Sequence, residues 1–225
     1  MILLFSGGID SYIAWYYLDK PKTLYFNLGT PYTEKERAVV RKLLPFTTID
    51  YSLNLKDRQV GENAYVPFRN LYLAMLACKY SDTIVIAGVK DDDVSDKNEQ
   101  IFQKFSDILS EMENRPIKVL SPFWNMTKEN IVAWYVNEVN YGRIKENLGH
   151  QLVNTISCYS YVKGNYCGTC PSCFRKWCAL RANDIYFDFY NIPLMMEYLK
   201  KAEEGHYIPE RNTNIIKCVK GYLNI

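Results

Sequence analysis

Residues 1–15 read MILLFSGGIDSYIAW, and this stretch decides how the chain begins to fold. Residues 1–5 are a continuous apolar run, which is typical of a strand covered on both faces. Two glycines follow at once, and a helical pattern then runs over residues 12–18. Glycine lets backbone N–H groups approach an anion closely, and the first turn of a helix adds unpaired N–H groups and a partial positive charge. The stretch therefore predicts a phosphate-binding turn between a strand and a helix.

The predicted phosphate-binding residues are the six of this glycine turn: Ser6, Gly7, Gly8, Ile9, Asp10 and Ser11. The two serines supply hydroxyl groups, and we expect Asp10 either to cap the helix or to reach a Mg²⁺ ion that is bound to phosphates. The P-loop pattern with its lysine and the dinucleotide pattern G-x-G-x-x-G do not occur here. The alternative interpretation is an ordinary strand–helix turn with a serine cap.

Strand-like and helix-like segments alternate through most of the chain. Further strands are predicted at residues 23–28, 47–51, 83–89 and 117–120. Helices are predicted at residues 32–44, 69–80, 98–112, 127–139 and 193–201. This alternation is typical of the α/β class, in which helices cover both faces of a doubly wound parallel sheet.

Ligands of such sheets bind beyond the carboxyl ends of the strands. We therefore expect the glycine turn and residues 88–91 to face one crevice. The alternation stops near residue 155, where a cluster of cysteines begins. We assign residues 1–154 to the α/β domain and residues 155–225 to a small C-terminal lobe packed on it.

Composition and charge narrow the class of protein. The 225 residues are 48% hydrophobic with a net charge of +2, which gives no reason to expect binding to nucleic acid or to membrane surfaces. No apolar run is long enough to span a bilayer, and the first residues lack the basic segment of a signal peptide. We therefore expect a cytoplasmic protein without a membrane partner. In that reducing compartment, seven cysteines favour metal binding or chemistry over disulfides.

Four of the cysteines have a spacing that is typical of metal binding. Cys158 precedes the C-x-x-C-x-x-C run of Cys167, Cys170 and Cys173, and Gly168 lets the chain turn so that the sulfurs converge. Four thiolates close a tetrahedral Zn²⁺ shell and leave no open position, which predicts a structural ion. Reduced core cysteines and an iron–sulfur cluster are the alternatives.

The string Ser-Gly-Gly-Ile-Asp-Ser resembles the SGGxDS motif of the PP-loop ATP pyrophosphatases. Together with the late cysteine run, it resembles the QueC family of 7-cyano-7-deazaguanine synthases. Further matches fall in the family's order at residues 65–70 (YVPFRN), 86–89 (IAGV), 127–128 (TK) and 155–159 (TISCY). The resemblance covers roughly residues 1–180.

This resemblance implies a ligase that forms C–N bonds in queuosine biosynthesis. Such an enzyme uses ATP with Mg²⁺ to adenylate the carboxylate of 7-carboxy-7-deazaguanine, lets ammonia displace AMP, and carries structural Zn²⁺. On this interpretation the glycine turn binds ATP, and Asp10, Arg69 and Lys128 are the catalytic candidates, the two cations neutralising phosphate or carboxylate charge. The alternative for Arg69 and Lys128 is a solvated surface cation. The resemblance also suggests a homodimer with small-molecule substrates.

The predicted substrate contacts lie where the chain departs from the family. In residues 90–101, Asp93 and Ser95 align with the family pattern and Glu99 stands in place of its Asp, but the Tyr-Pro pair, the Cys and the Arg are missing. With Asn70, these three residues are predicted to contact the deazaguanine. A solvated acidic loop at residues 91–96 and a helix-capping role for Asn70 are the alternatives.

A second departure follows Cys173, where the family has Arg at the third position and this chain has Arg175 second and Lys176 third. Both departures leave the exact substrate open. The alternatives are a related ligase that joins the deazaguanine carboxylate to another amine, in a protein or a phage DNA-modification route, and a PP-loop tRNA-thiolation enzyme. A non-catalytic, zinc-stapled binding module is a third.

Overall fold

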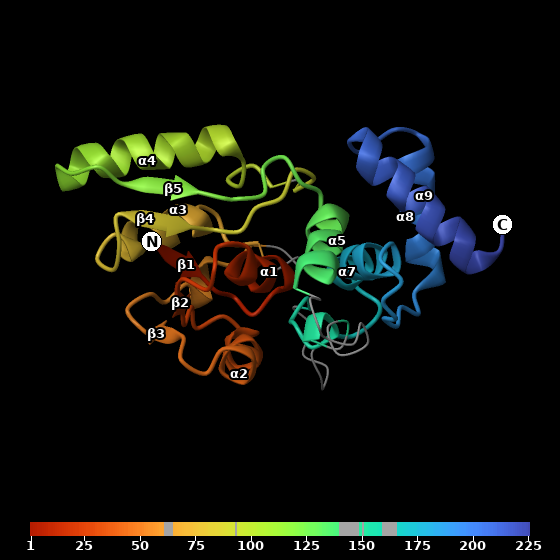
Figure 1. The fold of residues 1–225 in the computed structure, drawn as a ribbon, viewed down its shortest axis with the longest axis horizontal. Helices are drawn as coiled ribbons and strands as arrows, with labels where there is room; N and C mark the ends of the chain where they lie inside the picture. The colour runs from red at the N-terminus through yellow and green to blue at the C-terminus, as the bar shows by residue number, and fades with distance from the viewer. Residues whose placement is uncertain (61–64, 93, 140–148, 150, 159–165) are drawn as a thin grey trace.

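The computed structural model describes residues 1–60, 65–92, 94–139, 149, 151–158 and 166–225. Its centre is a parallel sheet in the order β3-β2-β1-β4-β5 (Figure 1). The strands are short and mostly buried: β1 (Ile2–Leu4), β2 (Lys22–Phe26), β3 (Thr48–Asp50), β4 (Thr83–Val85) and β5 (Lys118–Leu120). On the central strand, Leu3 pairs with Thr23 of β2 on one side and with Val85 of β4 on the other. The predicted doubly wound parallel sheet of the α/β class is confirmed.

Helices connect the strands and cover the sheet: α1 (Ile9–Tyr17), α2 (Thr33–Leu43), α3 (Arg69–Ala77), α4 (Glu99–Glu113) and α5 (Lys128–Glu138), with the 3-10 turn η1 (Lys56–Arg58) after β3. Successive side chains of a strand point to opposite faces, which separates two buried clusters. Leu3 lies in the cluster with α1 and α5, whereas Ile2 and Leu4 lie in the cluster with α3 and α4. Both faces are therefore apolar, which explains why the central strand β1 reads as an uninterrupted apolar run.

The order in which strands are added to the sheet reverses at β1, because β2 and β3 lie on one side of it and β4 and β5 on the other. The glycine turn leaves β1 at this switch point, and the segment after β4 leaves beside it. The strand predicted over residues 83–89 pairs in the ladder only up to Val85. Its remaining residues carry polar groups to the edge of the sheet where ligands bind in folds of this kind.

Helix α7 (Pro171–Arg181) begins within the cysteine run and contains Cys173, and α8 (Ile192–Glu203) and α9 (Pro209–Leu223) follow it. Figure 1 shows them on the side of α5 that faces away from the sheet. Of these, only α8 was predicted from the sequence. Trp177 of α7 and Val219 of α9 belong to the same buried cluster as Leu3 of β1, so the lobe shares the core of the α/β domain.

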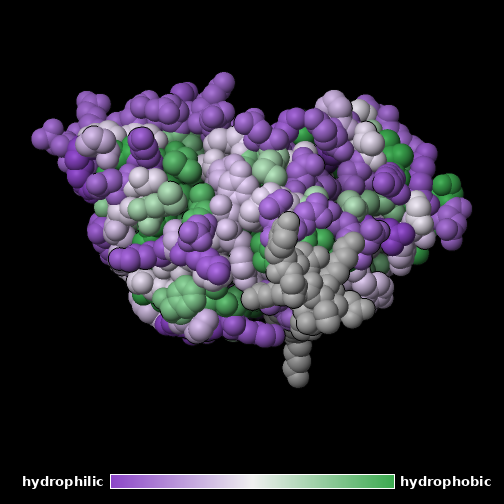
Figure 2. All heavy atoms as spheres, viewed as in Figure 1, coloured by the Kyte–Doolittle hydropathy of each residue, from purple (hydrophilic) through white to green (hydrophobic). Residues whose placement is uncertain are grey.

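Helix α4 illustrates how local sequence places an element. The side chain of Asn98 accepts a hydrogen bond from the backbone N of Ile101 at 3.0 Å and caps the helix, and Asn114 ends it in the left-handed conformation. Figure 2 shows hydrophilic side chains along the outer side of α4, at the top of the view. In the part of the chain that the structure describes, no helix combines the length and apolarity needed to cross a bilayer.

Candidate active site

A cavity of about 630 Å³ lies at the carboxyl ends of β1, β2 and β4. Its wall combines segments far apart in the sequence, among them the glycine turn, the start of α3, the first turns of α7 and the residues Val94, Asp96 and Lys97. A concave space of this size at a switch point is typical of a small-molecule site. The segments that follow β1 and β4 thus meet in one crevice, which is called the cavity below. After β4, however, its wall takes Ala87 and Asp92 and not the predicted residues 88–91.

The glycine turn has the backbone that its sequence predicts. Gly7 has a φ of 74°, and a side chain there would bring its Cβ to 3.1 Å from Cγ1 of Val39. The backbone N of Gly8 donates to Oγ of Ser6 at 3.3 Å, and Oγ of Ser11 donates to the carbonyl of Gly8 at 3.0 Å. The turn thus presents backbone N–H groups and hydroxyls together at the first turn of α1, an arrangement suited to an anion.

Asp10 and Lys128 form a close ion pair on the wall of the cavity. Nζ of Lys128 lies 2.5 and 2.6 Å from the two carboxylate oxygens of Asp10, and both side chains are largely buried. Helix α1 has no side-chain cap, so Asp10 does not serve as one. Lys128 is placed by the start of α5, where Thr127 and Asn130 form a capping box. Lys128 is therefore a buried, paired cation, and the alternative of a solvated surface cation is wrong for it.

The segment after β4, residues 89–92, forms a turn with two buried carboxylates, and it is called the acidic turn below. Oδ1 of Asp92 lies 2.7 Å from Nη1 of Arg175, and its Oδ2 lies 2.7 Å from Nζ of Lys97. Oδ2 of Asp91 lies 3.2 Å from Nη2 of Arg175, and its Oδ1 accepts from the backbone N of Lys128 at 3.0 Å. The side chains of Asp91 and Asp92 are only 1% and 5% exposed, so the alternative of a solvated acidic loop is wrong for these two residues.

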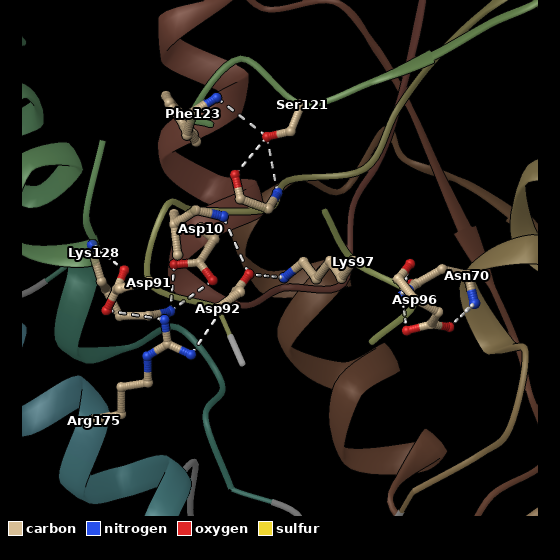
Figure 3. A network of polar contacts seen from close by, with 12 residues as sticks. Asp10, Asn70, Asp91, Asp92, Asp96, Lys97, Ser121, Phe123, Lys128 and Arg175 are labelled. Carbon is tan, nitrogen blue, oxygen red and sulfur yellow. Dashed lines mark hydrogen bonds and ion pairs between the residues drawn. The ribbon is translucent and has the colours of Figure 1, made fainter. Parts of the chain in front are cut away.

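Three carboxylates and three cations thus share one charged cluster, drawn in Figure 3: Asp10, Asp91, Asp92, Lys97, Lys128 and Arg175. Burial opposes the ionisation of Asp92, but the nearby Lys97 and Arg175 outweigh it and hold the pKa of Asp92 far below its ordinary value. Burial likewise opposes the charge of Arg175, and the aspartates outweigh it and raise the pKa of that guanidinium. Asp92 and Arg175 therefore face each other as a carboxylate and a guanidinium cation.

The turn that carries the cluster is anchored to the sheet. Gly88 donates its backbone N to Oγ of Ser121 at 2.9 Å and accepts from that hydroxyl through its carbonyl at 2.6 Å (Figure 3). A side chain at Gly88 would place its Cβ 2.5 Å from Trp124. These contacts fix where the acidic turn leaves the sheet.

The opposite end of the cavity, toward β2 and α2, is more apolar. Phe26 and Leu28 line it together with Arg69 and Glu36, and Oη of Tyr25 donates to Oε2 of Glu36 at 3.0 Å. Burial raises the pKa of Glu36 to about 7, against the opposing effects of Arg69 and the Tyr25 hydrogen bond. This end offers apolar surface for a ring and one titratable carboxyl.

Asn70 and Asp96 meet on the same wall. Nδ2 of Asn70 donates to Oδ1 of Asp96 at 3.0 Å, and the backbone N of Asn70 lies 3.4 Å from Oδ2 (Figure 3). The Asp96 carboxylate therefore lies at the first turn of α3, where the helix dipole favours negative charge.

The four clustered cysteines converge on one point. Their sulfur atoms all lie within 4.8 Å of one another, with 3.9 Å between Cys167 and Cys173 and 3.9 Å between Cys158 and Cys170. A Zn–S bond of about 2.3 Å places tetrahedral sulfurs about 3.8 Å apart, so the sulfurs could hold a single ion such as zinc. Gly168, with a φ of 69°, makes the expected turn.

The sulfur cluster also favours ionisation of one ligand. A hydrogen bond with Cys170 outweighs burial and lowers the pKa of Cys173 to about 4. A thiolate is the form of cysteine that binds metal, so a lowered pKa suits Cys173 as a metal ligand.

Lys176 connects the cysteine segment to the glycine turn. Its Nζ donates to the carbonyls of Val153 and Thr155 at 2.9 and 2.7 Å, and the next residue, Ile156, donates its backbone N to the carbonyl of Gly7 at 2.9 Å. Burial and the nearby Lys128 lower the pKa of Lys176 to about 7. Lys176 is 1% exposed and is one of the residues that line the cavity, where it holds residues 153–155 against α7.

Not every predicted site residue lies on the cavity. Its wall includes Asn70, Arg69, Lys128 and most of the glycine turn, whereas Ser95 and Glu99 are exposed and are not among the lining residues. Asp93 lies outside the described residues. Asp92, Lys97 and Arg175 were missed as site residues, although the position of Arg175 just after the cysteine run was a signal. The aspartates were noticed, but no local pattern distinguishes a buried acidic turn from a solvated one.

Comparisons with known proteins show which family the chain resembles. The family model described as "Queuosine biosynthesis protein QueC" matches residues 47–184. A 7-cyano-7-deazaguanine synthase of Anaeromyxobacter sp. is 30% identical over 124 residues, which are 50% of this chain and 49% of that protein. Synthases of the same name from Staphylococcus epidermidis and Prochlorococcus marinus are 25% and 27% identical, over 78% and 79% of this chain and 89% and 94% of their own length.

Proposed function

Because the chain belongs to the QueC family of queuosine-biosynthesis proteins, we propose that it is an ATP-dependent ligase that makes 7-cyano-7-deazaguanine from 7-carboxy-7-deazaguanine and ammonia. Its relatives carry the name of this product. The observation that carries the proposal is that the glycine turn and the charged cluster lie on the wall of one cavity, beside an apolar end that suits a ring. The cavity can thus accept phosphates and a base together.

The proposed reaction uses two molecules of ATP, and each converts a substrate oxygen into a leaving group. A carboxylate oxygen of the substrate attacks the α-phosphorus of ATP, the bond to the bridging oxygen breaks, and pyrophosphate leaves with the electron pair. Ammonia attacks the acyl carbon, AMP leaves and nitrogen loses a proton, which produces the amide. The amide oxygen then attacks the α-phosphorus of a second ATP, and pyrophosphate again leaves with the electron pair of the broken bond. Loss of AMP and of the two remaining N–H protons leaves the nitrile.

A carboxylate oxygen is a poor leaving group until it carries AMP, so the protein's task is alignment and charge neutralisation. We assign binding of the pyrophosphate portion to the backbone N–H groups and hydroxyls of the glycine turn. Lys128 lies beside this turn, held by Asp10, and is placed to stabilise charge on the transferred phosphorus. Arg69, at the apolar end, is placed to meet the substrate carboxylate or a phosphate.

The two metals have different relations to the site. The carboxylates of Asp10 and Asp92 are both engaged by cations, so these residues do not present a ready Mg²⁺ site, and we treat Mg²⁺ as entering with ATP. Zinc fits the four convergent sulfurs, Cys158, Cys167, Cys170 and Cys173. With all four positions taken by thiolates, it would stabilise the lobe and supply no reactive position.

The proposal is tested by supplying 7-carboxy-7-deazaguanine, ATP, Mg²⁺ and ammonium and by measuring pyrophosphate and the nitrile by mass spectrometry. The expected result is formation of nitrile, which Lys128→Met abolishes and Lys200→Met does not. Lys200 is a suitable control because it is an exposed lysine of α8. If pyrophosphate is released without nitrile and the deazaguanine carboxylate is coupled to another amine, that amine and not ammonia is the acceptor. No pyrophosphate release from any deazaguanine carboxylate would refute the proposal, and sulfur transfer to tRNA would favour the thiolation alternative.

A further inference from the structure

Helix α9 contacts the acidic turn, although it lies beyond the residues that the family model matches. Nη1 of Arg211 donates to the backbone carbonyl of Asp91 at 3.1 Å. One residue earlier on each segment, Glu210 pairs with Lys90 at 2.5 Å. The Glu210–Lys90 pair is exposed and contributes little to stability by itself. The Arg211 hydrogen bond instead holds the backbone of Asp91, whose side chain is only 1% exposed.

The position of Asp91 determines two other parts of the charged cluster. Its carboxylate accepts from the backbone N of Lys128 and pairs with Arg175. Lys128 in turn holds Asp10 in the glycine turn. A displacement of the Asp91 backbone would therefore move both cations that face the phosphate-binding turn.

A second contact from α9 reaches the start of α5. Nδ2 of Asn214, about one turn after Arg211, donates to Oε1 of Glu129 at 2.7 Å. Glu129 directly follows Lys128, so α9 contacts the chain on both sides of the Asp91–Lys128 hydrogen bond.

The Arg211 side chain is itself held in place. Its guanidinium carbon lies 4.1 Å from the centre of the Tyr207 ring, and the backbone N and carbonyl of Tyr207 are bound by the Asn212 side chain at 3.1 and 2.7 Å. A planar guanidinium stacked in this way directs its N–H groups along fixed lines, which a lysine ammonium does not do.

We propose that the first turns of α9 are a positioning element of the active site, in which Arg211 fixes the backbone of Asp91 and thereby the charged cluster that receives the triphosphate. The inference rests on the proposed function in one respect, namely that the ligand of the cluster is ATP. It assigns to the C-terminal helices a role in nucleotide binding in addition to packing.

The test measures binding of an ATP analogue that carries a methylene group between the α- and β-phosphorus atoms and so resists cleavage. Calorimetry compares the wild type with Arg211→Met, Arg211→Lys and the control Arg181→Met. Arg181 is a matched control because its guanidinium also lies over aromatic rings, 5.7 Å from Trp177 and 5.3 Å from Tyr222, but is not on the cavity wall.

We expect Kd to rise on the order of tenfold in Arg211→Met, as for loss of one charge-assisted hydrogen bond, and to recover in part in Arg211→Lys. Arg181→Met should bind like the wild type. Equal affinity of Arg211→Met and the wild type would overturn the inference and leave the proposed function intact. A wild type that does not bind the analogue would instead refute the proposed function. If Arg211→Met cannot be purified, Arg211→Lys is compared with Arg181→Lys, and equal affinities again overturn the inference.

Discussion

Replacement of Gly7 by alanine tests the idea that the glycine turn is a phosphate site. Gly7 has a φ of 74°, and an added Cβ would lie 3.1 Å from Cγ1 of Val39 and 3.4 Å from Cγ2 of Val40. The variant therefore carries a backbone penalty and a steric penalty. The backbone penalty would arise at any glycine with a positive φ. The steric penalty is particular to Gly7, because it pushes the glycine turn away from α2.

The two penalties can be separated with a matched control. Gly205 has a φ of 75°, but its added Cβ would meet no atom of the described chain within 4 Å. A left-handed alanine costs about 1–2 kcal/mol, offset by about 0.4–1 kcal/mol from the more restricted unfolded chain, so Gly205→Ala should lose about 1 kcal/mol. Overpacking against Val39 adds about 1–3 kcal/mol, so Gly7→Ala should lose about 2–4 kcal/mol. At about 2–4 °C per kcal/mol, the two melting temperatures differ measurably.

Urea unfolding measures the stability change, and binding of the uncleavable ATP analogue measures the function. We expect Gly7→Ala to weaken binding at least about tenfold, because displaced N–H groups no longer converge on the phosphate. Gly205→Ala should bind like the wild type. If Gly7→Ala loses stability as calculated but binds the analogue normally, the turn does not hold the phosphates and the reasoning is refuted.

Three further predictions concern the ion pair, the sulfur cluster and the titratable carboxyl. Lys128→Met leaves Asp10 unpaired in a mostly buried position and should cost about 1–3 kcal/mol of stability, measured by urea unfolding, and about a hundredfold in pyrophosphate release. Cys170→Ser should lower bound zinc, measured by elemental analysis, whereas Cys78→Ser should retain it because Cys78 lies apart in the core. Glu36 has a folded pKa of about 7 against an ordinary value of 4.5, so the folded state binds a proton more tightly than the unfolded state. The resulting stabilisation is complete below about pH 4.5 and is lost as the pH rises to about 7, and Glu36→Gln should remove this slope in unfolding measurements across that range.

Each of these predictions has an outcome that contradicts it. Unchanged pyrophosphate release by Lys128→Met would show that the cation only balances Asp10. Equal zinc in the Cys170 and Cys78 variants would place the ion elsewhere. A pH slope that persists in Glu36→Gln would assign the titration to another group.

Particular elements show why some features were predictable from the sequence and others were not. The strands β1 and β4 were predictable because burial on both faces requires an unbroken apolar run. The sulfur cluster was predictable because three of its ligands lie within seven residues, Cys167 to Cys173, so local spacing alone brings them together. Helices α7 and α9 were not predicted, and both carry apolar residues that are buried only against distant parts of the chain.

The charged cluster could not be predicted in the same way. Asp10 and Lys128 are separated by 118 residues, and Arg211 and Asp91 by 120. Each of these residues is an ordinary charged residue in its local sequence, and only the tertiary structure brings it beside its partner. The predicted substrate contacts Ser95 and Glu99 came from the resemblance to a family segment. The charged residues of the same stretch that line the cavity are instead Asp92, Asp96 and Lys97.

The amino-acid sequence by itself determined the alternation of strands and helices, the glycine turn and the four-cysteine spacing, because each depends on interactions within a few residues of chain. Only the tertiary structure decided which charges are buried, which of them pair, and that a helix near the C-terminus contacts the acidic turn. The physical reason is that a charge in a protein interior requires a compensating partner, and the sheet brings such partners together from distant segments.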